Sequence, residues 1–266
     1  MSPGATAAPV PALILAGSRG PDDPMAVAAG VSHKAFLPVG GVPMIRRVVR
    51  ALLASPVVGD LLVSIERPDL VQGDGELAPL LESGRLRILP AAGSPARSVA
   101  AALQAVGTPL LATTADHALL DPAWITHFWT HVPADADVAA ALARREVVER
   151  DVPTTQRTWL RFADGQFSGC NLFAFRTPAA SGLVETWAQV EQDRKNPLKL
   201  IALLGPVAVA KFAMGGLTLT DALKRLEAIT GAAGAIVEMP FGRAAVDVDK
   251  PADLTLAEQL LESSAS

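Results

Sequence analysis

Cysteine, tyrosine and excess basic charge are all missing or scarce in this 266-residue chain. The single cysteine, Cys170, cannot form a disulfide within the chain, and nothing else points to an oxidising compartment. With 23 Lys and Arg against 27 Asp and Glu, the net charge is −4 at pH 7. Because nucleic-acid-binding proteins usually carry a basic surface, this balance does not favour a nucleic-acid partner.

Long hydrophobic runs are missing too. The most apolar late stretch, residues 197–214, is interrupted by Lys199 and Gly205–Pro206, whereas a bilayer-spanning helix needs about 20 nearly uncharged residues. Residues 1–10 have neither the basic nor the apolar region of a signal peptide. We therefore expect no transmembrane segment, a disordered lead over residues 1–10, a single domain over residues 11–266, and a cytoplasmic protein.

Two common phosphate-binding motifs are absent. The chain has no G-x-x-x-x-G-K-[ST] segment, which argues against a P-loop ATPase, and no G-x-G-x-x-G after its first apolar run, which weakens a dinucleotide-binding interpretation. That run ends instead in Gly-Ser-Arg-Gly-Pro at residues 17–21. This turn of small residues either reverses the chain or holds an anion.

Short apolar runs alternate with helical patterns through the first half of the chain. We expect helices at residues 43–55, 98–106 and 122–131, the last with Asp121 as N-cap, and buried strands at residues 11–16, 60–66, 86–91 and 109–115. An alternation of strand and helix predicts an α/β fold with a mainly parallel sheet and right-handed crossovers.

The second half of the chain has a different pattern. Residues 158–175 resemble a β-hairpin with Asp164–Gly165 in its turn. Helical segments follow, then two short expected strands at residues 235–240 and 244–249, and a closing helix from residue 251. The economical interpretation is an α/β core that carries a β-hairpin and helical insertion.

Small and acidic residues follow several expected strands. In open α/β sheets, ligands bind beyond the carboxyl ends of the strands, so these residues should meet at one edge. The first strand is followed by the glycine turn, the strand at 109–115 by Asp116, and the last strand carries Asp247 and Asp249. Small residues let backbone N–H groups approach an anion, and carboxylates are ligands for Mg²⁺. The pattern predicts a site for a metal-bound phosphate chain.

Several motifs together resemble the nucleotidyltransferase superfamily of MobA-like and IspD-like enzymes. They are "LAGSRG" at residues 15–20, Lys34 followed by "GVP" at 41–43, "TTADHALLDP" at 113–122 and "VDVDKPADLTLAEQLL" at 246–261. The resemblance implies a three-layer α/β/α fold shared with GT-A glycosyltransferases. It also implies transfer of a nucleoside monophosphate from a nucleoside triphosphate to an acceptor, with release of pyrophosphate.

The resemblance also implies roles for individual residues. Lys34 and Arg19 would neutralise phosphate charge as catalytic residues, although Arg19 is shifted from the position of the family's arginine. Asp116 and one of Asp247 and Asp249, with Asp249 preferred, would bind Mg²⁺. The nucleotide would contact Lys34, Ser98 and the turn made of Leu15, Ala16, Gly17, Ser18, Arg19 and Gly20.

The base and the acceptor are predicted from two further segments. Residues 93–103, "GSPARSVAAAL", resemble the segment with which IspD-like cytidylyltransferases read cytosine, which places Ser98 at the base and favours CTP over GTP, the nucleotide of the MobA-like branch. A phosphorylated small-molecule acceptor would bind the portion at about 150–215, where Arg157, Lys195 and Lys199 are candidates for its phosphate.

Two other function classes stay open. A GT-A glycosyltransferase that uses an NDP-sugar would share the fold, and Asp247-Val248-Asp249 matches the D-x-D motif. A catalytically silent nucleotide-binding module would share the turn and bind nucleotide without turnover.

Overall fold

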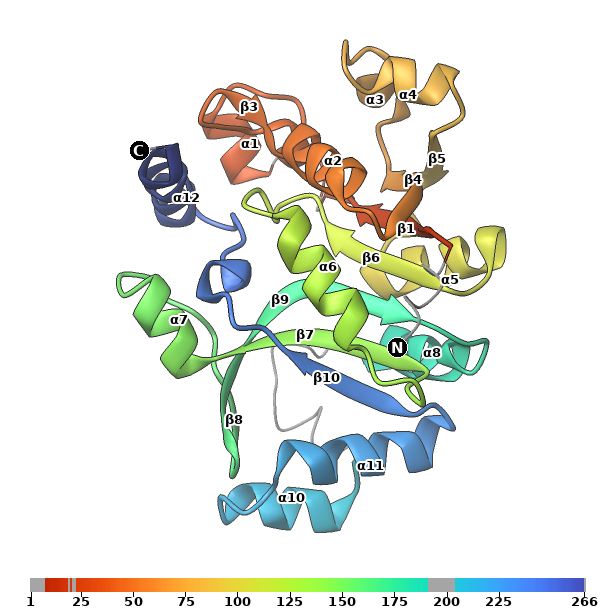
Figure 1. Cartoon of the computed structure of the whole chain (residues 1–266), viewed down its shortest axis with the longest axis vertical. Coiled ribbons are helices and arrows are strands. Elements are labelled where there is room, and N and C mark those ends of the chain that lie inside the picture. Colours follow the sequence, from red (N-terminus) through yellow and green to blue (C-terminus); the bar gives the residue numbers. More distant parts are fainter. Residues whose placement is uncertain (1–7, 19, 21–22, 191–203, 266) are drawn as a thin grey trace, which may run out of the picture.

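An eight-stranded mixed sheet runs through the described part of the protein (Figure 1). The computed structural model describes residues 8–18, 20, 23–190 and 204–265. The strand order is β10-β7-β9-β6-β1-β4-β5, with β8 paired to β9. The strands are β1 (Val10–Leu15), β4 (Val58–Ile65), β5 (Leu86–Pro90), β6 (Leu110–Thr114), β7 (Val138–Arg144), β8 (Leu160–Phe162), β9 (Gly165–Phe175) and β10 (Gly234–Glu238).

The sheet is mostly parallel. β1 pairs in parallel with β4 and β6, β4 with β5, and β7 with β10, whereas β9 is antiparallel to β6, β7 and β8. The carboxyl ends of β1, β4 and β6 therefore meet at one edge, as the α/β prediction requires.

Helices cover both faces of the sheet (Figure 1). In β1, Ala12 and Ile14 pack in one core cluster with α2 (Met44–Ala54) and α6 (Pro122–His131). Leu13 lies in a second cluster with α5 (Pro95–Val106) and α8 (Ala180–Val190). A strand buried on both faces has no polar side to show, which explains the continuous apolar run of β1. The three-layer α/β/α prediction is confirmed.

Shorter elements complete the described chain. Two two-residue strands, β2 (Pro38–Val39) and β3 (Val42–Pro43), form a small antiparallel ribbon. The other helices are α1 (Pro24–Ala28), η1 (Lys34–Phe36), α3 (Pro68–Gln72), α4 (Ala78–Glu82), α7 (Arg145–Asp151), α10 (Pro206–Ala213), α11 (Leu219–Thr230), η3 (Gly242–Ala245) and α12 (Pro251–Ala265). Among the described residues, no helix is long and apolar enough to span a bilayer.

Most of the predicted elements are confirmed, with small shifts at their ends. Asp121 caps α6, because its side chain accepts a hydrogen bond of 2.7 Å from the Ala123 backbone N–H. The predicted hairpin is β8–β9, but Phe162 pairs with Gly165, so its turn lies one residue earlier than expected. β1 starts at Val10, inside the expected N-terminal lead.

Two sequence-based expectations about strands are wrong. Residues 244–249 do not form a strand: η3 is followed by irregular chain in which the Val248 N–H donates to the Asp116 carbonyl at 3.0 Å. The alternating valines of this segment are buried by packing across the end of β6, which gives the same pattern as a strand. In the main sheet, the strand that the sequence did not predict is β7, "VAAALAR", whose alanines have little intrinsic strand preference but are buried between β9 and β10.

A third core cluster attaches the end of the chain to its beginning. Val248 is 1% exposed and lies in this cluster with Leu37, Met44 and Ala257 of α12. Apolar contacts of Val248 within this cluster therefore hold the segment that carries Asp247 and Asp249 in place.

Val248→Ala should lower the free energy of unfolding by about 2 kcal/mol, since it deletes two buried carbons and leaves a cavity. The matched control is Val207→Ala in α10, where valine is 70% exposed and the change should stay within about 0.5 kcal/mol. Urea unfolding of both variants measures the difference. Equal losses would contradict the role given to the third cluster.

Candidate active site

Lys34 joins two carboxylates at the carboxyl edge of the sheet. Its Nζ donates to Asp116 Oδ2 at 3.0 Å and to Asp249 Oδ1 at 2.7 Å. Lys34 opens η1, directly after His33, whose Nδ1 accepts a hydrogen bond from the Ala35 N–H. The fold thus brings together three predicted site residues that lie 82 and 215 positions apart in the sequence.

Backbone contacts hold the two carboxylates side by side. Asp116 follows β6, and its carbonyl accepts the Val248 N–H, which places Asp249 one residue beyond that bond. Asp253 Oδ2 then accepts the N–H groups of Asp249 at 3.2 Å and Lys250 at 3.1 Å. Asp253, in the first turn of α12, therefore reaches back to the chain before the helix and orients Asp249.

The charges in this cluster do not balance. Burial raises the pKa of Asp116, and Asp247 and Asp249 raise it further, while Lys34 opposes them. Burial by itself would lower the pKa of Lys34, but its two carboxylate partners outweigh that effect and raise it above its ordinary value. Two carboxylates thus share one firmly protonated amine, and the site has a place for a further positive charge.

The residues at this edge fit a divalent cation that takes its remaining ligands from elsewhere. Asp116 Oδ1 is buried and has no hydrogen-bond partner in the described part of the chain. Mg²⁺ usually takes one or two carboxylates from the protein and completes its shell with phosphate oxygens and water, a demand that Asp116 and Asp249 meet. Within the described residues, no group of three or more acidic, His or Cys side chains forms a closed metal cage.

Asp247 has different partners from Asp249. Arg157 Nη2 donates to Asp247 Oδ1, and Asn171 Nδ2 donates to Oδ2 at 3.2 Å, so both carboxylate oxygens are engaged. Arg157 is 11% exposed, and its Nη1 lies 3.9 Å from Asp253 Oδ1. Arg157 therefore ties the chain before the hairpin to the closing segment.

Asn171 is a site residue that the sequence places in the predicted acceptor-binding portion but to which it assigns no role. It has a φ of +49°, in the left-handed region that Asn enters more readily than most other residues. It lies in β9 next to Leu172, whose partner Thr113 is near the end of β6. No local sequence pattern predicts this backbone conformation. Asn171 adopts it at the position where its side-chain amide donates to Asp247.

The glycine turn is occupied by a carboxylate from the neighbouring strand. Glu66 follows β4, and its two oxygens accept the Ser18 N–H at 3.0 and 3.2 Å. His33 Nε2 lies 3.1 Å from Glu66 Oε1. The expected strand at residues 60–66 includes Glu66, whereas β4 ends at Ile65, so only the structure places Glu66 directly after a buried strand.

Other predicted residues have mixed placements. Leu15, Ala16 and Gly17 line a small hollow together with Lys34 and Asp116. Ser98 is buried outside that lining, and its Oγ accepts the Ala92 N–H at 3.2 Å. Gly20 has a φ of +129°, which favours glycine there. Arg19, Lys195 and Lys199 lie outside the described residues.

The sequence matches the family model of the MobA-like NTP transferase domain over residues 12–234. The chain belongs to this family. The prediction of a nucleotidyltransferase is therefore confirmed, and a nucleoside triphosphate is the substrate that the family implies. No curated protein matches the sequence of this MobA-like transferase.

Solved structures share the fold of this MobA-like transferase. A hypothetical transferase from Thermus thermophilus is 28% identical, with a TM-score of 0.77 over 92% of this chain and 99% of the other. A 4-diphosphocytidyl-2C-methyl-D-erythritol synthase from Anaerococcus prevotii is 12% identical, with a TM-score of 0.55 over 96% of each chain. A CMP:2-keto-3-deoxy-manno-octonic acid synthetase complexed with CTP is 14% identical, with a TM-score of 0.52 over 96% of this chain and 99% of the other.

Asp247→Asn should lower the stability of this MobA-like transferase clearly, whereas Asp249→Asn should change it little. Removing one partner of a buried ion pair costs about 3–5 kcal/mol, and Asp253 still faces Arg157, so we expect Asp247→Asn to cost about 2–3 kcal/mol. Asp249 is 60% exposed, and its loss relieves repulsion with Asp116, so Asp249→Asn should stay within about 0.5 kcal/mol.

Urea unfolding with EDTA present measures both variants without a contribution from bound metal. A larger loss of stability in Asp249→Asn than in Asp247→Asn would contradict the assignment of a structural role to Asp247 and not to Asp249.

Proposed function

We propose that this enzyme transfers a nucleoside monophosphate from a Mg²⁺-bound nucleoside triphosphate to a phosphorylated small-molecule acceptor, with release of pyrophosphate. The observation that carries the proposal is the Lys34 bridge between Asp116 and Asp249, at the sheet edge where the glycine turn begins. A polyphosphate and a metal ion both need partners there, and the cluster offers one cation, Lys34, and two carboxylates, Asp116 and Asp249, as hard-oxygen ligands.

The charge of the cluster supports metal dependence. Asp116, Asp249 and Lys34 sum to one net negative charge, and a bare triphosphate would be repelled by it. Asp116 and Asp249 would hold Mg²⁺, with the buried Asp116 Oδ1 as the oxygen in need of a partner. When bound, Mg²⁺ supplies charge neutralisation for phosphate oxygens and helps to orient them.

The side chains at the site support a reaction without a general base. A phosphate monoester is already ionised near pH 7, so its oxygen can attack the α-phosphorus directly; one P–O bond forms and the bond to pyrophosphate breaks. His117, next to Asp116, is fully buried and stacks on Trp124 with 6.0 Å between ring centroids. Burial lowers the pKa of His117 to about 4, so it is neutral at pH 7 and packs rather than transfers protons.

CTP is the proposed nucleotide, and GTP is the second candidate. CTP is supported by the resemblance of residues 93–103 to a cytosine-reading segment, in which Ser98 holds the preceding turn through the Ala92 N–H. Two of the similar folds also carry cytidine nucleotides in their descriptions. GTP is supported by membership of the MobA-like family.

The two alternative classes are less well supported by the site. A D-x-D pair would present both carboxylates to one metal, whereas Asp247 faces Arg157 and Asn171, and Asp249 faces Lys34. A silent binding module would not need the Lys34 bridge, which is intact. The acceptor is proposed to bind the portion at about 150–215, with Lys195 or Lys199 at its phosphate, because Arg157 is already paired with Asp247.

Asp116→Asn should reduce turnover by two or more orders of magnitude, which corresponds to about 3 kcal/mol of transition-state stabilisation. The assay follows pyrophosphate release from each of the four nucleoside triphosphates, with Mg²⁺ and pooled phosphorylated metabolites as acceptors. The matched control is Asp60→Asn, a surface aspartate 60% exposed, which should keep wild-type turnover. Wild-type turnover of Asp116→Asn at saturating Mg²⁺ would contradict the metal assignment.

CTP should raise the melting temperature of the wild-type enzyme more than GTP at equal concentration with Mg²⁺ present. A site that hydrogen-bonds one base leaves its polar groups unpaired with another, so the stabilisation should be base-specific. Differential scanning fluorimetry with all four triphosphates gives the ranking, and the same series in EDTA is the control for metal dependence. A larger shift with GTP would replace CTP by GTP in the proposal.

A further inference from the structure

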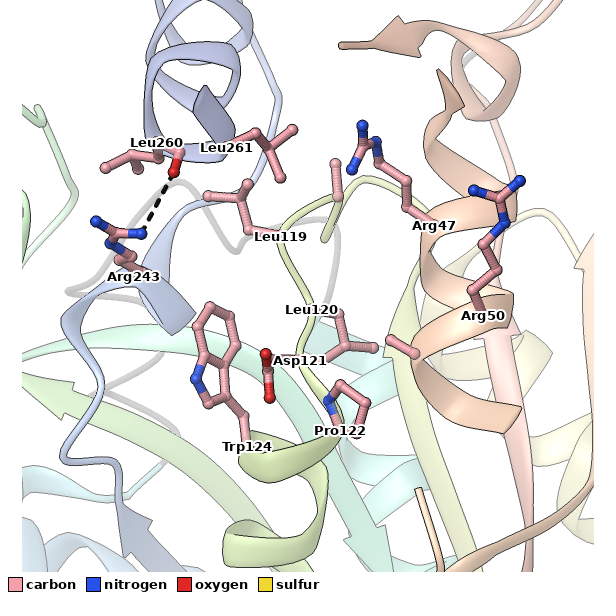
Figure 2. A pocket seen from close by; sticks show the side chains of 12 residues that line it. Arg47, Arg50, Leu119, Leu120, Asp121, Pro122, Trp124, Arg243, Leu260 and Leu261 are labelled. Atoms are coloured by element: carbon pink, nitrogen blue, oxygen red, sulfur yellow. Dashed lines mark hydrogen bonds between the residues drawn. The ribbon is translucent and has the colours of Figure 1, made fainter. Parts of the chain in front are cut away.

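A larger pocket lies away from the hollow at Lys34, between α2, α6 and α12 (Figure 2). Its volume is about 440 Å³, within the range of about 300–1,000 Å³ that small-molecule sites occupy. It shares no lining residue with the hollow that contains Lys34 and Asp116. The chain nevertheless runs directly from Asp116 into the pocket's central segment at residues 118–122.

Arg47 contributes a positive charge to the wall of this pocket. It is half-buried on α2, and its Nε donates to the Val39 carbonyl at 2.7 Å. Within the described chain, no carboxylate lies within ion-pair distance of it. Burial lowers the pKa of Arg47, and the charge of Arg50 lowers it further, against a smaller opposing effect of Glu258. An anion beside Arg47 would relieve this cost.

The other charged side chains of the pocket are already engaged. Arg50 pairs with Glu76 through two bonds, Nε–Oε1 at 2.7 Å and Nη2–Oε2 at 2.6 Å. Arg243 donates to the Leu260 carbonyl at 3.3 Å, the bond drawn in Figure 2. Asp121 accepts the Ala123 N–H as the cap of α6. Arg47 differs from Arg50 in having no carboxylate within ion-pair distance among the described residues, and only the more distant Glu258 offsets its charge.

The space between Arg47 and Arg243 is mostly apolar. In Figure 2, Leu119 and Leu261 lie between the two guanidinium groups, and the Trp124 ring lies below them. The apolar lining comes from α2, the 118–122 segment, α6 and α12, and includes Ala51, Leu119, Leu120, Trp124, Leu260 and Leu261. A ligand here would need an acidic group at one end and an apolar body at the other.

We infer that this pocket binds a small organic anion, whose carboxylate, sulfonate or phosphate group pairs with Arg47 and whose apolar body lies against the leucines and Trp124. The geometry carries the inference: a pocket of sufficient volume, one guanidinium without a carboxylate partner at its wall, and an apolar lining opposite. The inference does not depend on the proposed function, because it uses no residue of the Lys34 site.

The test uses 8-anilinonaphthalene-1-sulfonate, a sulfonate on an aromatic body, as the probe. A fluorescence titration of the wild-type chain should saturate at one probe per chain. Arg47→Gln should raise the Kd about 10-fold or more, since it removes a charge-assisted bond, whereas Arg47→Lys, which keeps the charge, should raise it only about 3-fold. The matched control Arg50→Gln should leave the Kd within about 2-fold, because Glu76 already neutralises Arg50.

Two further measurements keep the result interpretable. Ala51→Met fills the pocket without changing its charge, and should also raise the Kd about 10-fold by displacing the probe. Melting curves of each variant exclude probe binding to a loosened chain, which this dye also reports. Unchanged affinity in both Arg47→Gln and Ala51→Met, or an equal loss in Arg50→Gln, would overturn the inference.

Discussion

The bridge from Lys34 to Asp116 and Asp249 is the interaction on which the rest of the site depends. It joins the start of the chain, the end of β6 and the start of α12, and it does so with one amine between two carboxylates. Two like charges held close together at one sheet edge repel each other, and the single charge of Lys34 can compensate only one of them. This excess of negative charge favours the binding of a cation at the edge. It also means that the surrounding chain must hold the two carboxylates together against their repulsion.

The carboxylates are held in place by an apolar side chain and by an arginine that is already paired with carboxylates. Val248 anchors the closing segment in an apolar cluster and donates its N–H to Asp116. Arg157, buried among Asp247 and Asp253, draws the chain before the hairpin onto the same segment. Asp247 and Asp249, two positions apart, thus have different roles. Asp247 pairs with structural partners, whereas Asp249 lies at the surface beside Lys34.

The glycine turn shows how the edge is organised without a ligand. Glu66 accepts the Ser18 N–H and approaches His33, so an internal carboxylate stands at a backbone donor that an anion would otherwise use. A phosphate that uses this donor must displace Glu66 or bind beside it. The Arg47 pocket has the opposite character, because there a cation has no carboxylate within ion-pair distance in the described part of the chain.

The resemblance to a known family pointed to Lys34. Local patterns in the sequence determined the alternation of strands and helices, the cap of α6, the hairpin and the candidacy of Asp116. These features depend on the period of apolar residues and on what directly follows a strand, and both can be read from neighbouring residues. Only the tertiary structure decided that β7 is a strand, that residues 244–249 cross β6 instead of pairing, and that Asp247 rather than Asp249 meets Arg157. Those outcomes depend on contacts between residues about 80 to 215 positions apart, which compete for the same few charges and the same buried space.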